Sequence, residues 1–597
     1  MRLRRLLAAV VLMALAPVSA QAAGGVWTPI RVAPAVTKGS ADLPQMALES
    51  DGTAVAAWSE NNSVRAATRL PGGTFGAPHA IGTSTTLAVP DATVSVGLRA
   101  LVLLHSQQGT GATLVASSVA GASVGPPEQA AATTAPITEA AAALRADASA
   151  LAVYAVATSP MTISSAARTP AGGWAPAGDI TLPPTVTLVQ QLRLQPLPNG
   201  GAVLLFLGQG AAAGDVPRPY AALRSAAGVW SALVPLDPGA TTASDDLGLG
   251  VDAAGNAYAA WSLADGRVRT STMPAAGAFT VAATTATAAR TPRIAVAPAG
   301  GGVLLAWIDV SGAPVLRTSE WTAAGLATAA STPLPTAATT LESLALGDTT
   351  AASAIVTEST GAGAAQTFGT DVLERPATAT PWAVQNVRTG LTEPVGSPQL
   401  AMSALGAFAL WVEGNVVVAS GTDHALPRVL AIAKPKKIGI GVLGPYSLRA
   451  TDSWSPIADV TWRYGDGTTE RGASVRHAYS HAGSFHVTVI VHDAAGNAAQ
   501  RTFVVVAVPL ASAASATATA RGLSVGVSCM PSNPSITGTV TAVIPGAKIV
   551  AFRCSVPGKG TALVPGTSAR GTRVVVRVTP VDLAGLPHPR ASTLPTR

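Results

Sequence analysis

The segment Leu249–Trp261, LGVDAAGNAYAAW, indicates the fold of most of the chain. It consists of a short apolar run, a turn that contains Gly255, a second apolar run and a tryptophan. Two apolar runs joined by a glycine-containing turn predict a β-hairpin. Three further segments show the same order of features: Gln45–Trp58 (QMALESDGTAVAAW), Ile294–Trp307 (IAVAPAGGGVLLAW) and Leu400–Trp411 (LAMSALGAFALW). The chain therefore repeats one hairpin unit.

The tryptophans that end these segments are separated by multiples of about 50 residues, which is the length of one repeat. Weaker copies of the unit fill the intervals and end at His105, Tyr154, Phe206 and Val356. Each unit continues with two more short runs, and glycine and proline punctuate all of them. Four short strands per repeat of this length are typical of a β-propeller blade. We interpret the repeat aromatics as packing between blades, with ligand stacking as the alternative. They are Trp58, Trp261, Trp307 and Trp411.

The two ends of the repeat region predict how the propeller closes. The last unit, Pro398–Thr422, holds only three strands, whereas Val26–Ala33 is a single strand without a blade. Val26–Ala33 resembles Gly228–Pro235, the fourth strand of another unit. Pairing the two ends would complete a blade and leave no exposed sheet edge. We predict eight blades over residues 23–430, or seven because three of the units are degenerate.

The first 22 residues of the 597 have the features of a secretory signal peptide. Three arginines within Met1–Arg5 precede an apolar run, Leu6–Ala16, and the small-x-small pattern Ala20-Gln21-Ala22. No later run reaches the roughly 18 apolar residues of a membrane span, although 48% of the residues are hydrophobic. We therefore expect a protein that is secreted or associated with the cell surface, with no transmembrane segment after the signal peptide.

The charge composition gives no indication of nucleic-acid binding. The formal net charge is +7, three of those charges belong to the predicted signal peptide, and only 12% of the residues are charged. No long basic stripe occurs, so we expect no nucleic-acid partner.

A second module follows a predicted linker at Lys434–Lys437. Its motifs are Trp462-Arg-Tyr-Gly-Asp-Gly467, His477-Ala-Tyr479 and Gly483-Ser-Phe485. Over about residues 438–508 they resemble the PKD domain, an immunoglobulin-like β-sandwich of exported bacterial proteins. The family usually has Trp-Asp-Phe-Gly-Asp-Gly and a later tyrosine, which Arg463, Tyr464 and Phe485 replace here. The resemblance implies a structural motif made of Trp462, Tyr464, Gly465, Asp466, Gly467, His477, Tyr479, Gly483 and Phe485.

Local patterns agree with that fold. Trp462 suits the centre of a sandwich, and the glycines beside Asp466 permit positive φ in a tight turn. From Phe485 onward, alternate residues face the core, which places His486 and His492 on the outer face. These histidines lie about 20 Å apart along a strand, too far to share one ion, and we predict no metal and no other cofactor.

The last part of the chain, residues 521–597, again alternates apolar and polar residues and predicts a small C-terminal β-sandwich. We interpret Ala511–Ala520, which is rich in alanine, serine and threonine, as the linker before it. Cys529 and Cys554 are the only cysteines, and in an exported chain we expect them to form a disulfide. Two buried free thiols are the alternative.

No motif predicts catalysis. Gly121–Gly125 matches G-x-S-x-G but lies between β-runs, whereas the hydrolase motif requires a strand–turn–helix. We predict no catalytic residues and an exported, non-catalytic protein that binds carbohydrate or protein through its propeller loops. The PKD-like module would serve as a spacer or a secondary contact. The alternatives are an extracellular polysaccharide-active hydrolase with its site on the propeller face, and a structural envelope protein without a small ligand.

Overall fold

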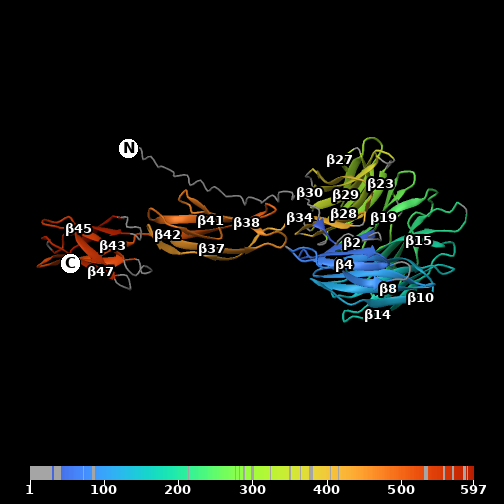
Figure 1. Ribbon diagram of the computed structural model, residues 1–597, viewed down its shortest axis with the longest axis horizontal. Coiled ribbons are helices and arrows are strands. Elements are labelled where there is room, and N and C mark those ends of the chain that lie inside the picture. Colours follow the sequence, from blue (N-terminus) through green and yellow to red (C-terminus); the bar gives the residue numbers. More distant parts are fainter. Residues whose placement is uncertain are drawn as a thin grey trace, which may run out of the picture. The chain divides into compact units, whose positions relative to one another are not determined.

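The computed structural model describes most of the chain as β-strands in two units (Figure 1). The described residues are 30–32, 42–71, 73–83, 88–212, 214–275, 277–280, 283–286, 289–297, 302–322, 325–335, 337–347, 351–362, 365–375, 381–403, 405–414, 416–529, 536–554, 559–567, 570–581, 587 and 589–597. The predicted signal peptide, 1–22, lies outside them. One unit extends to Ala425 and includes Ser453–Ser455, and the other comprises Leu426–Asp452 and Pro456–Arg597. The predicted all-β fold class is confirmed.

Eight sheets make up the first unit, and each is one blade. Blade 1 is β2 (Asp42–Leu48), β3 (Ala54–Glu60), β4 (Ser63–Arg69) and β5 (His79–Thr83). Blade 2 is β6 (Ala88–Val96), β7 (Arg99–Gln108), β8 (Gly111–Ala120) and β10 (Glu128–Thr133), with β9 (Ser123–Val124) beside β8. Blade 3 is β11 (Ile137–Leu144), β12 (Ala150–Val156), β13 (Thr162–Arg168) and β14 (Trp174–Ile180). Blade 4 is β15 (Leu188–Pro196), β16 (Ala202–Gln209), β17 (Arg218–Arg224) and β18 (Val234–Pro235).

The second half of the unit continues the pattern. Blade 5 is β19 (Ser244–Val251), β20 (Ala257–Leu263), β21 (Val268–Met273) and β22 (Ala283–Ala286). Blade 6 is β23 (Ala289–Val296), β24 (Val303–Asp309), β25 (Val315–Thr322), β26 (Gly325–Leu326) and β27 (Ala330–Pro333). Blade 7 is β28 (Ala338–Leu346), β29 (Ala352–Thr360), β30 (Thr367–Arg375) and β31 (Ala383–Leu391). Blade 8 is β32 (Val395–Ser403), β33 (Gly406–Glu413), β34 (Val416–Asp423) and the N-terminal strand β1 (Ile30–Arg31).

The blades form a closed ring. The first strand of each blade packs beside the first strand of the next, and β32 of blade 8 packs beside β2 of blade 1. Strand β1 pairs antiparallel with β34, with Ile30 opposite Ala419 and Arg31 opposite Val418. The outermost strand of blade 8 therefore comes from the N-terminal part of the chain. Of the segment 26–33 that we expected there, residues 30–32 are described.

The apolar runs of the repeats pack between the blades. Eight clusters of buried apolar side chains lie in the first unit, one at each boundary between consecutive blades. In β3, for example, Val55 and Ala57 face blade 2, whereas Ala56 and Trp58 face blade 8. Because the middle strands are buried on both faces, they are continuously apolar.

The second unit begins with the PKD-like sandwich. One sheet contains β35 (Arg428–Ala433), β37 (Gly444–Thr451) and β40 (Ser474–His477). The other contains β36 (Lys437–Gly439), β42 (Ala498–Val508), β41 (Gly483–Asp493), β38 (Ile457–Arg463) and β39 (Thr469–Arg471). Strand β35 lies upstream of the predicted linker at Lys434–Lys437 and pairs with β37, so this sandwich starts earlier than the predicted residue 438.

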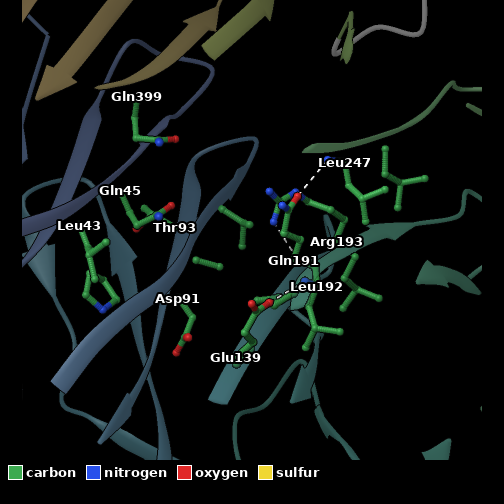
Figure 2. A pocket seen from close by; sticks show the side chains of 18 of the residues that line it. Leu43, Gln45, Asp91, Thr93, Glu139, Gln191, Leu192, Arg193, Leu247 and Gln399 are labelled. Atoms are coloured by element: carbon green, nitrogen blue, oxygen red, sulfur yellow. Dashed lines mark hydrogen bonds between the residues drawn. The ribbon is translucent and has the colours of Figure 1, made fainter. Parts of the chain in front are cut away.

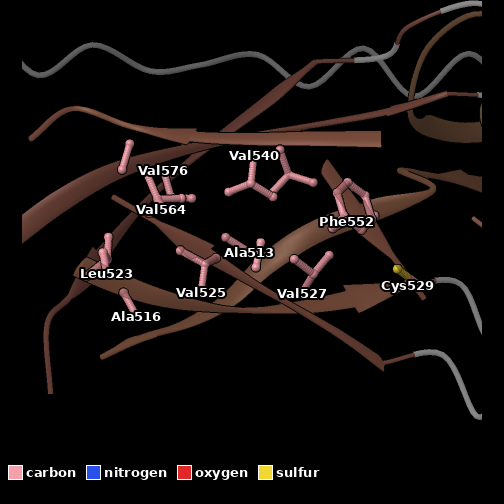
Figure 3. Close-up of a cluster of buried hydrophobic side chains, with 14 of the residues drawn as sticks. Ala513, Ala516, Leu523, Val525, Val527, Cys529, Val540, Phe552, Val564 and Val576 are labelled. Atoms are coloured by element: carbon pink, nitrogen blue, oxygen red, sulfur yellow. The ribbon is translucent and has the colours of Figure 1, made fainter. Parts of the chain in front are cut away.

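The C-terminal sandwich encloses the cluster of side chains in Figure 3 between two sheets. One sheet contains β43 (Ala511–Thr519), β44 (Gly522–Cys529) and β47 (Lys559–Val564); the other contains β46 (Val550–Arg553), β45 (Thr537–Ala542), β48 (Arg573–Val581) and β49 (Arg590–Pro595). The prediction of a linker at 511–520 is wrong, because β43 pairs with β44 and buries Ala511, Ala513 and Ala516. Small side chains let this strand pack closely. The predicted disulfide joins Cys529 and Cys554.

Candidate functional site

A large concave site in the described residues is the central channel of the propeller, a cavity of about 710 Å³. Residues of the first strand of every blade line it. Figure 2 labels lining residues of six of these strands, β2, β6, β11, β15, β19 and β32. The polar lining residues include Gln45, Asp91, Thr93, His105, Glu139, Gln191, Arg193, Gln195, Arg293, Glu342, Ser343, Ser397 and Gln399. A channel with this lining accommodates a polar ligand.

A β-bulge near the start of each first strand turns these polar residues toward the channel. The pairing register between the first and second strands shifts at this position in all eight blades. Four residues at or beside these bulges, Leu43, Gln191, Thr291 and Ser397, have positive φ. A bulge leaves a backbone N–H without its usual cross-strand acceptor. The ring must therefore supply other acceptors for these N–H groups.

Polar side chains of the preceding blade supply several of them. Glu139 accepts a hydrogen bond from the Leu192 N–H at 2.8 Å, and Gln191 accepts one from the Leu247 N–H at 2.9 Å. The same arrangement continues as follows: Thr291 accepts from the Leu341 N–H at 3.0 Å, and Ser343 accepts from the Leu400 N–H at 3.2 Å. These bonds link consecutive blades at the channel wall. Much of the polar lining therefore stabilises the ring.

The carboxylates of the lining are all bonded to protein donors. Asp91 pairs with His105 at 2.8 Å, and both side chains are buried. Burial raises the pKa of Asp91, although hydrogen bonds from His105 and the Ala140 backbone oppose the shift. Glu139 accepts the Leu192 N–H, and Glu342 accepts the Thr357 hydroxyl at 2.9 Å. Each of these three carboxylates thus makes at least one bond to a protein group.

Arg193 differs from these groups because its side chain is exposed to the channel. Its Nη1 donates to the backbone oxygen of Leu192 at 3.2 Å. Arg193 lies deep in the channel, and this burial together with the charge of Arg293 lowers its pKa, whereas Glu139 and Asp246 oppose the shift; an arginine remains charged at neutral pH. Arg293 itself pairs with Asp246 at 3.4 Å. Arg193 is thus the channel cation best placed to meet a ligand.

Amide side chains accompany Arg193. Gln195 follows it on β15, and Figure 2 shows Gln45 and Gln399 on the other side of the channel. A glutamine amide both donates and accepts hydrogen bonds, as ligand hydroxyl groups also do. Two-carboxylate hydrolysis requires two carboxyl groups that face the substrate. The carboxylates of the described lining are bonded to protein groups, and beside them the lining offers amides and a guanidinium that can hydrogen-bond a ligand.

The repeat tryptophans lie away from the channel lining. Trp58, Trp261 and Trp411 are fully buried, and Trp307 is nearly so. Each packs in the cluster that its blade shares with the preceding blade. The Nε1 of Trp58 donates to Glu60 and that of Trp411 donates to Glu413. In these positions the four rings contact neighbouring blades.

The nine PKD-motif residues lie together in the second unit. Trp462, Tyr464, Tyr479 and Phe485 are core residues, and Gly483 begins the strand that carries Phe485. Gly465 and Gly467 have positive φ, and a Cβ on Gly465 would come within 2.6 Å of the His486 oxygen. Asp466 accepts the Thr468 N–H at 3.0 Å and pairs with His477 at 2.8 Å. Burial opposes ionisation of Asp466, but these hydrogen bonds outweigh it and lower its pKa.

Comparison with known proteins identifies one of the domains. Residues 427–508 match the family model of the PKD domain, and the chain therefore contains a PKD domain. No curated protein matches the chain.

Three solved structures are similar to parts of this chain at low sequence identity. A protein of unknown function from Dyadobacter fermentans is 12% identical over 66% of this chain and 97% of its own, with a TM-score of 0.36. The WD40 domain of SCAP from fission yeast is 10% identical over 66% and 94%, with a TM-score of 0.40. The PKD1 domain of Vibrio anguillarum Epp is 17% identical over 14% and 95%, with a TM-score of 0.13.

Proposed function

We propose that the protein is an exported, non-catalytic carbohydrate-binding protein whose propeller channel receives the end of a glycan with a carboxylate or another anionic substituent. The observation that carries this proposal is the solvent-reached side chain of Arg193 in a channel that is also lined by the amides of Gln45, Gln195 and Gln399. Guanidinium groups bind carboxylates in a bidentate manner, and amides bind sugar hydroxyls. The predicted signal peptide agrees with an extracellular ligand.

The dimensions of the channel favour a glycan end over a folded protein partner. A volume of about 710 Å³ lies within the range of small-ligand sites, roughly 300–1,000 Å³. The carboxylates Asp91, Glu139 and Glu342 are bonded to His105, the Leu192 N–H and Thr357. Because the lining carboxylates are engaged in this way, we propose that the channel binds a glycan without cleaving it.

The test is a calorimetric titration of the mature protein with a panel of acidic and neutral oligosaccharides. We expect acidic glycans to bind and Arg193→Gln to weaken that binding at least tenfold, since a charge-assisted hydrogen bond is worth about 1.5–3 kcal/mol. Arg99→Gln is the matched control, because Arg99 is exposed at the hairpin between β6 and β7. Equal binding by wild type and Arg193→Gln, binding of neutral glycans alone, or release of shortened products would each contradict the proposal.

A further inference from the structure

Positive charge is concentrated in the C-terminal sandwich. Residues 509–597 contain nine lysines and arginines but a single acidic residue, Asp582. Residues 22–425 have the opposite balance, with 17 basic and 25 acidic residues. The basic side chains of the sandwich therefore have almost no local carboxylates to neutralise them. All nine are exposed.

Five of these cations lie at one end of the sandwich, which we call the tip. The tip consists of the described residues within 519–522, 543–549, 565–573 and 596–597. Backbone hydrogen bonds hold its loops together: Thr567 donates to Pro545 at 3.0 Å, Gly571 to Thr596 at 2.8 Å and Ala518 to Arg597 at 3.1 Å. The five tip cations are Arg521, Lys548, Arg570, Arg573 and Arg597.

The tip is the end away from the covalent connection to the PKD domain. Strand β43 starts at Ala511, just after β42 ends at Val508, and runs toward the tip. In Figure 3, Ala516 and Leu523 mark the tip end of the core, whereas Phe552 and Cys529 mark the other end. The polypeptide connection therefore leaves the tip accessible.

Two aliphatic side chains protrude beside these cations. Val543 is 77% exposed and Ile549 is 72% exposed, the highest values among the large hydrophobic side chains of the described residues. Both belong to the loop that contains Lys548. Aliphatic groups as exposed as these gain free energy when another apolar phase covers them.

We propose that the tip binds the surface of a lipid bilayer that contains anionic lipids. The cations would contact headgroup phosphates, while Val543 and Ile549 would enter the boundary between headgroups and acyl chains. This combination of charge and apolar side chains is what peripheral membrane attachment requires, because either contribution alone gives weak binding.

Two features favour a membrane over a soluble glycan or a single small anion. Residues 509–597 contain no tryptophan or tyrosine, and the one phenylalanine, Phe552, is buried, so no aromatic platform is available for a sugar ring. The cations come from several loops and from Arg597, which follows β49, whereas a small anion is bound by donors that converge on one point. A spread of charge matches an extended anionic surface.

The test is co-sedimentation of the full mature protein with vesicles of phosphatidylcholine, with and without phosphatidylglycerol. We expect binding that requires phosphatidylglycerol and decreases with added salt. The triple variant R521Q/K548Q/R573Q should weaken binding about 100-fold, since each cation near an anionic surface contributes about fivefold. V543S/I549S should also weaken binding while leaving the net charge unchanged.

The control triple variant, R553Q/R577Q/R590Q, removes the same charge from exposed positions outside the tip. It should lose at most about tenfold, because only the long-range attraction decreases. Equal losses of vesicle binding in the two triple variants would overturn the proposal that the tip is the binding surface. Absence of vesicle binding, with binding to a soluble anionic polysaccharide or self-association instead, would overturn the membrane proposal. Far-ultraviolet circular dichroism checks that each variant is folded.

Discussion

The propeller and the C-terminal sandwich use charged residues in opposite ways. In the propeller, Asp91, Glu139 and Arg293 bond to protein groups along the channel wall. In the sandwich the basic residues are all exposed and carboxylates are nearly absent. The modest net charge of +7 therefore conceals an acidic domain and a strongly basic one. Averages over a whole chain can hide a strongly basic domain that a count by domain reveals.

The two regions also differ in how their strands are buried. A middle strand of a blade, such as β12, is buried at all seven positions because another blade covers each face. Strand β48 of the sandwich instead alternates exposed and buried residues over most of its length, because solvent covers one face. A substitution in a middle strand of a blade should therefore disturb packing at any position, whereas in β48 it should do so mainly at alternate positions.

The largest effect should come from Trp58→Ala, at the boundary where blade 8 meets blade 1. Trp58 is fully buried, and removing a large buried aromatic costs about 3–5 kcal/mol. We expect differential scanning calorimetry to show a lower melting temperature for the propeller and an unchanged transition for the C-terminal sandwich. A downward shift of both transitions would show that the two units unfold together.

In the C-terminal sandwich, the comparable substitution is one that removes the disulfide. Cys529 and Cys554 are 25 residues apart in sequence, and a cross-link of that span contributes about 3 kcal/mol. We expect C529S/C554S to lower the sandwich transition and to leave the propeller transition unchanged. Because both cysteines of the chain are in this bond, a reducing agent should reproduce the effect in wild type. Insensitivity to reduction would contradict this expectation.

Much of the fold follows from local sequence, whereas the channel does not. A glycine turn between two apolar runs predicts each hairpin, and the recurrence of that pattern predicts the blades. The channel contacts depend on ring geometry: Glu139 and Leu192 are 53 residues apart and meet only because consecutive blades are adjacent. The sequence pattern that could have predicted these contacts is a polar residue near the start of the first strand of each repeat.

Two features of the C-terminal region were also missed by sequence reasoning, for different reasons. The segment 511–520 has a composition typical of linkers, but its small residues pack in β43 against the core. The tip brings together Arg521, Lys548 and Arg597, which are far apart in sequence, so no basic stripe marks it. A count of charges by domain would have revealed the excess.

The pH dependence of stability should also separate the two regions. Asp371 is fully buried in blade 7, and burial together with Glu358 raises its pKa to about 8. The folded propeller therefore keeps a proton that the unfolded chain releases above about pH 4, so stability falls as pH rises toward 8. Between pH 6 and 8 we expect a loss of about 2 kcal/mol, at about 1.4 kcal/mol per proton and pH unit.

Urea denaturation at several pH values would measure this loss. Asp371→Asn should make the stability of the propeller depend less on pH, because the amide cannot ionise. Glu49, whose pKa burial and Asp51 raise to about 7, should account for part of the remaining slope. The C-terminal sandwich has one carboxylate and one histidine in sequence and should vary less. If the propeller gains stability between pH 6 and 8, the raised pKa of Asp371 does not govern its pH dependence.

We expect the smallest change in stability from substitutions in a pentapeptide that occurs in two domains. The sequence Asp-Ala-Ala-Gly-Asn occurs at Asp252–Asn256 in the propeller and at Asp493–Asn497 in the PKD domain. In both turns the aspartate Oδ1 accepts the asparagine N–H at 2.9 Å. The asparagine Nδ2 donates to Oδ2 at 2.8 Å in the propeller and at 3.0 Å in the PKD domain. The same five residues thus form the same turn in different surroundings.

If local sequence alone determines this turn, the same substitution should cost the same in both domains. Gly255 and Gly496 have φ of +88° and +92°, which an L-residue adopts with strain. We expect Gly255→Ala and Gly496→Ala each to cost about 1 kcal/mol, measured on the transition of the domain concerned. At Gly255 the nearest atom to an added Cβ is 3.4 Å away, an ordinary contact, so no clash should add to that cost. A difference of more than about 1 kcal/mol between the two variants would mean that tertiary contacts, and not the pentapeptide, determine the turn.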